Sequence, residues 1–295
     1  MKKIVLMLAF IAIINLLLVV LINGIEITNN DIKMCAKVDN NWGEEAVKYF
    51  KEYNSKEIYT PTVVFIDAGD VNKELNVDVY SVVPTSSQLE LSNHADYIIR
   101  KFLQLNSFSN IIYIKASNSD IIEYENLIEA MEKAIYLEPD IISMSIGTMR
   151  NYTQFQSLVN DAIKKNIVLV ASAGNSGLDL LYPAYYSGVI SVMARDINNL
   201  DCDYNNKSDK KKSFSAPGEE VYVDGKYISG TSIATSYVTA LIAKIISCVG
   251  KNKLSNEKII NILKRTSVKS NKYSYGLIQF KDALYAIKNF CKAAS

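Results

Sequence analysis

The apolar stretch Ile233–Val249 constrains the fold of this chain more than any other segment. Almost every residue in it is apolar, small or hydroxylated, Lys244 is its single charge, and Gly250 follows it. A helix that is apolar on all sides has to be buried in a large core, and a glycine directly after it is a common stop. We therefore expect a buried helix here, inside a domain large enough to enclose it.

Ser232 stands at the start of this helix, and Gly230 precedes it by two residues. The unpaired N–H groups and the dipole of a helix N-terminus favour negative charge, and glycine lets the backbone turn sharply. A serine in that place suits a nucleophile for acyl transfer. It also suits an ordinary N-cap, because serine is a favoured capping residue. Both interpretations stay open on this motif alone.

Composition excludes several classes of function. The chain has 295 residues, 49% of them hydrophobic, which fits one large domain or two small ones. Its 32 basic and 31 acidic residues leave a net charge of +1, so we expect no nucleic-acid partner. The four cysteines show no C-x-x-C spacing and there is one histidine, so we expect no zinc site. We also expect that no cofactor is required. The pattern makes no prediction about a structural calcium ion or the oligomeric state.

The N-terminal region carries a targeting signal. Two lysines precede the apolar run Ile4–Ile25, which is long enough to cross a bilayer as a helix and has no small-residue cleavage site after it. We predict that residues 1–25 form an uncleaved signal anchor in the cell membrane, with the rest outside the cytoplasm. A cleaved signal peptide and a secreted protein are the alternative. Residues 26–59 are polar and predict a linker or short pro-segment, with one short helix near Glu44–Tyr53.

Short apolar strands alternate with helices over residues 60–295. The strands lack polar alternation, as strands covered on both faces do. This order predicts an α/β domain with a mostly parallel central sheet and helices on both faces. The predicted strands are Thr62–Ile66, Ile111–Lys115, Asp140–Ser145, Ile167–Ala171 and one near Val189–Met193. The first predicted helix begins at the cap Ser92/Asn93. The other predicted helices are Glu123–Leu137, Phe155–Lys165, Ile233–Val249, Ser255–Lys264 and Asp282–Phe290.

Polar residues follow three of the predicted strands. Asp67 ends the first, Ser145-Ile146-Gly147 follows another and Ala173-Gly174-Asn175 a third. In parallel sheets, functional side chains gather at such carboxyl ends. His94, the one histidine, begins a helix 27 residues after Asp67. The order Asp67, His94, Ser232 is one of the known orders for a nucleophile triad on an α/β sheet.

The motifs around these residues resemble those of the subtilisin-like serine proteases, the subtilase or peptidase S8 family. The resemblance covers about residues 60–285 and rests on an ordered set of segments. These are Val63–Gly69 (the aspartate motif), Asn93–Asp96 (the histidine motif), Ile142–Gly147 (the substrate-binding strand), Val170–Gly177 (the oxyanion asparagine), Tyr182–Tyr185, Ser213–Gly218, Gly230–Ala234 (the nucleophile) and Tyr275–Ile278.

The resemblance implies a serine endopeptidase acting on peptides or proteins. Ser232 would attack the scissile carbonyl, and His94 would take its proton and return it to the leaving amine. Asp67 would orient the imidazole, and the Asn175 amide with the Ser232 N–H would bind the oxyanion. An extended substrate would be held as an added strand by Ser145, Ile146 and Gly147, with Ala173 and Gly174 beside it.

Several residues depart from the family pattern. Ala68 replaces a hydroxyl residue that could steady Asp67, and Asp96 is expected to place a second carboxylate near His94 and favour its charged form. Ala95 replaces glycine, Ser236 stands where the family has proline, and Ala240 where it has glycine. The departures near the triad keep an alternative open, namely a catalytically silent fold that binds peptides or a partner protease. An unrelated α/β hydrolase is excluded, because the serine lacks a G-x-S-x-G turn and the triad order differs.

Overall fold

The structure is a computed structural model that describes residues 43, 47–48, 57–84, 93–250 and 253–294. The predicted signal anchor (residues 1–25) lies outside the described residues. So does most of the segment 26–59, including nearly all of its predicted helix near Glu44–Tyr53.

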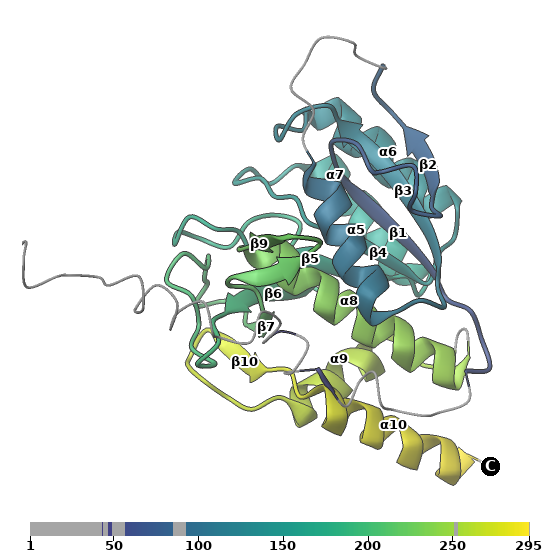
Figure 1. Ribbon diagram of the computed structural model, residues 1–295, viewed down its shortest axis with the longest axis vertical. Helices are drawn as coiled ribbons and strands as arrows, with labels where there is room; N and C mark the ends of the chain where they lie inside the picture. The colour runs from purple at the N-terminus through teal and green to yellow at the C-terminus, as the bar shows by residue number, and fades with distance from the viewer. Residues whose placement is uncertain (1–42, 44–46, 49–56, 85–92, 251–252, 295) are drawn as a thin grey trace, which may run out of the picture. The chain divides into compact units, whose positions relative to one another are not determined.

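A parallel sheet forms the centre of the described domain (Figure 1). Its eight strands follow the order β10-β7-β6-β5-β4-β1-β3-β2, and every pairing between them is parallel. The strands are β1 Thr62–Ala68, β2 Asp78–Ser81, β3 Asn110–Ser117, β4 Ile141–Met144, β5 Val168–Ser172, β6 Ile190–Arg195, β7 Ser213–Pro217 and β10 Ser274–Leu277. The mostly parallel α/β fold predicted from the sequence is confirmed.

Helices cover both faces of this sheet (Figure 1). Helices α5 and α8 pack together on one face, while α6 and α7 pack on the other. In chain order, α5 connects β2 to β3, α6 connects β3 to β4 and α7 connects β4 to β5, and all three connections run in the same direction across the sheet. Crossovers of one hand would therefore place all three helices on one face. Because α5 lies on the opposite face from α6 and α7, its crossover has the opposite hand. The helices are α5 His94–Leu105, α6 Tyr124–Tyr136, α7 Thr153–Lys164, α8 Thr231–Val249, α9 Asn256–Thr266 and α10 Phe280–Ala294.

The order of strands reverses at β1, which lies between β3 and β4. The connection after β1 leads toward β2 and the connection after β4 leads toward β5, in opposite directions, which opens a crevice at the carboxyl ends of β1 and β4. Asp67 is near the end of β1 and Ser145 directly follows β4. The fold therefore brings these two residues to the edge where a ligand is expected.

Helix α8 is the buried helix that the apolar stretch predicted, although it begins at Thr231 rather than Ile233. Its polar side chains have partners: Thr239 Oγ1 lies 2.9 Å from Ser143 Oγ on β4, and Lys244 forms an ion pair with Glu57. Among the described helices, α8 alone is long and apolar enough to cross a membrane by length and composition. Because 89% of its apolar window is buried in the domain, α8 is a core helix.

Five strands were not predicted, and their composition explains why. Strand β7 is rich in serine, yet it is buried because its hydroxyl groups bond to neighbouring strands: Ser213 to Ser191 at 2.8 Å and Ser215 to Ser274 at 3.1 Å. Ser274 belongs to β10, which follows β7 at one end of the sheet. Strand β2 is exposed along its length at the other edge. The last two form a short antiparallel hairpin, β8 Val221–Val223 and β9 Lys226–Ile228.

Candidate active site

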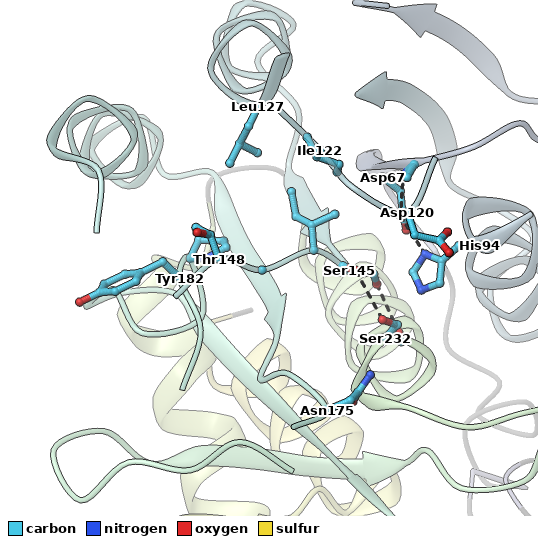
Figure 2. Close-up of a pocket in the computed structure, with 14 residues that line it drawn as sticks. Asp67, His94, Asp120, Ile122, Leu127, Ser145, Thr148, Asn175, Tyr182 and Ser232 are labelled. Carbon is cyan, nitrogen blue, oxygen red and sulfur yellow. Dashed lines mark hydrogen bonds and ion pairs between the residues drawn. The ribbon is translucent and has the colours of Figure 1, made fainter. Parts of the chain in front are cut away.

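The crevice beside β1 and β4 contains a cavity of about 280 Å³ (Figure 2). Seven of the predicted site residues line it, and they come from the ends of β1, β4 and β5 and from the first turns of α5 and α8. Ala173 and Gly174 lie next to Asn175 in the chain and are buried. The lining residues from the prediction are Asp67, His94, Ser145, Ile146, Gly147, Asn175 and Ser232.

Asp67 and His94 are joined by a hydrogen bond in the site, with His94 Nδ1 2.8 Å from Asp67 Oδ1. Only 3% of the Asp67 side chain is exposed, against 35% of the His94 side chain, so the carboxylate is buried and the imidazole faces the cavity. Figure 2 shows the second ring nitrogen on the side of Ser232. The Asp67 bond at Nδ1 leaves Nε2 as the nitrogen that can accept a proton from the cavity side.

The two carboxylate oxygens of Asp67 have different surroundings. Oδ1 accepts the bond from His94 and a second one from the Ala68 N–H at 2.7 Å. Oδ2 is buried and has no hydrogen-bond partner among the described residues. The side chain of Ala68, which replaces the family's hydroxyl residue, has no donor to offer it.

The charge of Asp67 raises the pKa of His94 above its ordinary value, while burial of the ring lowers it. The Asp67 hydrogen bond and the charge of Asp120 raise this pKa further. Asp120 was missed in the sequence, although it lies on the loop after β3 and thus at the same edge as Asp67. Asp96 instead accepts bonds from Arg100 Nε (2.6 Å) and from the N–H of Asn72 (2.8 Å). The prediction that Asp96 would act on His94 is wrong.

Ser232 is the second residue of α8, and Gly230 is the N-cap. The interpretation of Ser232 as an N-cap is therefore wrong. Its hydroxyl donates a long hydrogen bond (3.4 Å) to the carbonyl of Ser145, and the Ser145 hydroxyl donates to the carbonyl of Ser232 at 3.3 Å. Because the bond to Ser145 is long, rotation about χ1 can redirect the Ser232 hydroxyl at little cost.

Asn175 is oriented by the residue before the serine. Its Oδ1 accepts bonds from the N–H (2.8 Å) and the hydroxyl (2.9 Å) of Thr231. The amide nitrogen then points toward Ser232, as Figure 2 shows. A Cβ atom at Gly230 would lie 3.1 Å from this nitrogen, and the φ of +141° at Gly230 also requires glycine. Thr231 was part of a predicted motif, but its role in orienting Asn175 was not foreseen.

Asn206, a buried residue that the sequence did not indicate, holds the loop on both sides of Asn175. Its Oδ1 accepts bonds from the N–H and hydroxyl of Ser176, at 2.8 and 2.9 Å, and its own N–H donates to the carbonyl of Gly174 at 3.0 Å. Its Nδ2 donates to the carbonyl of Asp179 at 2.7 Å. The position of the Asn175 amide is thus determined by two independent sets of bonds.

This arrangement supplies a hydroxyl, an imidazole bonded to a carboxylate, and an amide donor around one cavity, which are the groups that acyl transfer needs. Within the described residues, no group of three or more His, Cys, Asp or Glu side chains is placed to hold a metal ion.

Comparison with known proteins agrees with this chemistry. A model of the Subtilase family matches residues 96–280, a range that includes Asn175 and Ser232 and begins just after His94. The minor extracellular protease Epr of Bacillus subtilis (strain 168) is 31% identical over 179 residues, which cover 56% of this chain and 28% of that protein. The major intracellular serine protease of the same strain is 30% identical over 159 residues, which cover 49% of this chain and 50% of that protein. The chain thus matches half or less of the length of these relatives.

Solved structures with the same fold include a maturation protease for prenylagaramide, PagA. Its TM-score to this chain is 0.69 at 20% sequence identity, and the superposition covers 82% of this chain and 98% of that one. At this identity the likeness shows the fold alone.

Proposed function

Because this chain belongs to the subtilase family, we propose that it is a serine endopeptidase that hydrolyses peptide bonds with Ser232, His94, Asp67 and Asn175. One observation carries the proposal: Asp67 holds His94 at 2.8 Å beside the cavity that Ser232 and Asn175 also line. An imidazole in this position can act as general base toward the serine.

In the first half of the reaction, Ser232 Oγ forms a bond to the scissile carbonyl carbon while its proton moves to His94 Nε2. The carbonyl oxygen becomes an oxyanion and accepts hydrogen bonds from Asn175 Nδ2 and the Ser232 N–H. Asp67 stabilises the imidazolium that forms. The C–N bond then breaks, the amine leaves with the proton from His94, and an acyl-serine remains.

In the second half, a water molecule attacks the acyl carbon and gives a proton to His94. The oxyanion forms again at Asn175, the bond to Ser232 breaks, and His94 returns the proton to Ser232 Oγ. The carboxylic acid product leaves and the site is regenerated. Every proton that His94 accepts is returned, so the cycle consumes only water and substrate.

The test is cleavage of a denatured protein by wild type and by Ser232→Ala, with Ser229→Ala as the matched control. Ser229 lies in the same loop, but its hydroxyl accepts a bond from the Glu220 N–H instead of lining the cavity. We expect Ser232→Ala to abolish cleavage and Ser229→Ala to retain it. We also expect Asn175→Ala to lower kcat by about 10²–10³. If the folded wild type cleaves no protein, the silent peptide-binding fold replaces this proposal.

We propose that the reaction requires no metal or cofactor, since the four residues supply the nucleophile, the base and the oxyanion donors. Dialysis against EDTA is expected to leave kcat unchanged. A lower Tm after EDTA with unchanged kcat would reveal a structural cation, whereas a loss of kcat that added metal restores would contradict the proposal.

For the location we propose a single-pass membrane protein with residues 26–295 outside the cytoplasm, on the basis of the apolar run after two lysines. Protease added to intact cells is expected to digest the domain, and the full-length chain is expected in the membrane fraction. A soluble form beginning near residue 26 would favour the cleaved signal and secretion.

A further inference from the structure

Leu181 bridges the two backbone segments that the proposed function assigns to the substrate. Its N–H donates to the carbonyl of Ala173 at 3.2 Å. The next residue, Tyr182, exchanges two hydrogen bonds of 2.9 Å with Thr148, which directly follows Gly147. Figure 2 shows Thr148 and Tyr182 side by side at one end of the cavity. Leu181 is thus attached on one side to the segment after β5 and, through Tyr182, to the segment after β4.

The side chain of Leu181 occupies the space between these segments. A Cβ atom at Gly147 would lie 2.6 Å from Leu181 Cδ1, and a Cβ atom at Gly174 would lie 2.8 Å from the same carbon. Real Cβ atoms do not approach other carbons so closely, so Leu181 leaves no room for a Cβ atom at Gly147. At Gly174, Leu181 adds to two other reasons for glycine, namely a φ of +109° and the amide of Asn206, whose Nδ2 would lie 2.7 Å from a Cβ atom. One methyl group therefore packs against the backbones of both segments at once.

The same space is where a substrate side chain would enter. For Ser232 to attack, the scissile carbonyl has to lie beside Ser232 Oγ with its oxygen toward Asn175 Nδ2. The main chain on the acyl side would then run along Ser145–Gly147 as an added strand. The side chain next to the scissile carbonyl would project between the Ser145–Gly147 segment and the Ala173–Asn175 segment.

We infer that Leu181 is a specificity-determining residue that restricts the amino acid on the acyl side of the scissile bond to glycine or alanine. This inference rests on the proposed function. A larger side chain would have to displace Leu181, which is held by the main-chain bonds on both sides, and overpacking of this kind is unfavourable. The substrates are therefore polypeptides that present a glycine or alanine in an accessible, extended segment.

The test uses two tripeptidyl diphenyl phosphonates that are identical except for alanine or phenylalanine next to phosphorus. These probes phosphonylate an active serine, with phenol as the leaving group, and their labelling rates report how well that side chain fits. For wild type we expect the alanine probe to react at least about 100-fold faster. In Leu181→Gly the labelling rate of the phenylalanine probe is expected to rise by a similar factor. In Leu181→Ala this rate is expected to lie between those of the wild type and Leu181→Gly.

Leu178→Gly is the matched control. Leu178 is in the same loop, but its side chain is 59% exposed, so its removal is expected to leave the ratio of the two rates unchanged. A small fluorophosphonate, which carries no amino-acid side chain, is applied to every variant to measure the active serine separately.

The outcomes separate this inference from the proposed function. A wild type that takes up the fluorophosphonate but reacts with phenylalanine as fast as with alanine would overturn the inference alone, and so would one that takes up neither peptide probe. A wild type that does not react with the fluorophosphonate would overturn the proposed function and this inference with it. Because the wild-type ratio is decisive by itself, the inference can be tested even if the Leu181 variants fail to fold.

Discussion

Asp67 has one carboxylate oxygen with two hydrogen bonds, while the other is buried and, within the described part of the chain, has none. A buried carboxylate oxygen without a donor is unfavourable, and the side chain of Ala68, the next residue, has no donor to offer it. The pair Asp67–His94 is therefore less well supported than the motif suggests. This is a deficit that one substitution can repair.

Ala68→Ser is expected to increase the free energy of unfolding by about 1 kcal/mol through a new bond to Asp67 Oδ2. We expect kcat/KM to rise modestly or to stay unchanged, because Oδ1 already orients His94. Urea unfolding and peptide hydrolysis measure the two effects. Ala68→Cys is the control, since a thiol has nearly the same shape but is a weak donor. A large loss of activity in the serine variant would contradict this account of Asp67.

The charge of Asp120 is expected to shift the pH at which the enzyme becomes active. His94 acts as a base only when neutral, so kcat/KM rises as the pH passes its pKa, which Asp67 and Asp120 raise. Asp120→Asn removes one of these charges and lowers that pKa, so the rise is expected to begin at lower pH. Asp96→Asn is the control, because Asp96 is bound to Arg100. If Asp96→Asn shifts the pH dependence of kcat/KM and Asp120→Asn does not, Asp96 and not Asp120 is the carboxylate that raises the pKa of His94.

At the scale of elements, α5 carries His94 and α8 carries Ser232, so their contact determines the distance between base and nucleophile. Ser236 contributes to this contact, since its buried hydroxyl donates to the carbonyl of Ile98 on α5 at 3.0 Å. The family has proline at this position. The substitution by serine is therefore compensated by a direct bond between the two helices.

Ser236→Ala is expected to lower the free energy of unfolding by about 1 kcal/mol, because a buried hydrogen bond between two helices is lost. Ser247→Ala is the matched control. Ser247 is equally buried in α8, but its hydroxyl donates to the carbonyl of Lys244 within the same helix at 2.8 Å. We expect the free energy of unfolding to fall less in Ser247→Ala than in Ser236→Ala. We expect kcat to fall only in Ser236→Ala. Equal losses of stability and activity in the two variants would contradict the role of Ser236.

The elements that the sequence predicted well are those whose burial depends on apolar side chains. In strands β1 and β3 to β6 and in helix α8 most residues are apolar, so composition was sufficient to find these elements. Strand β7 is buried through bonds between serine hydroxyls on neighbouring strands, such as Ser213 to Ser191. Pairing of this kind depends on residues distant in the chain and leaves no local pattern.

At the scale of the whole molecule, the parallel sheet explains both what was and what was not predictable in the site. Strand ends meet at one edge, so Asp67, Ser145 and Asn175 were expected to come together. Leu181 and Asp120 act through space on segments far from them in sequence, Leu181 on Gly147 and Asp120 on His94. Their roles follow from loop geometry that motif and periodicity do not encode.

The central claim is that the fold activates Ser232 as a nucleophile, and a fluorophosphonate probe with mass-spectrometric mapping of the adduct tests it most directly. We predict stoichiometric labelling of the folded wild-type chain at Ser232 and at no other serine. We also predict loss of labelling in Ser232→Ala and strong slowing in His94→Ala, because the imidazole removes the serine proton. A folded wild type that stays unlabelled, or that is labelled at another residue, would contradict the claim.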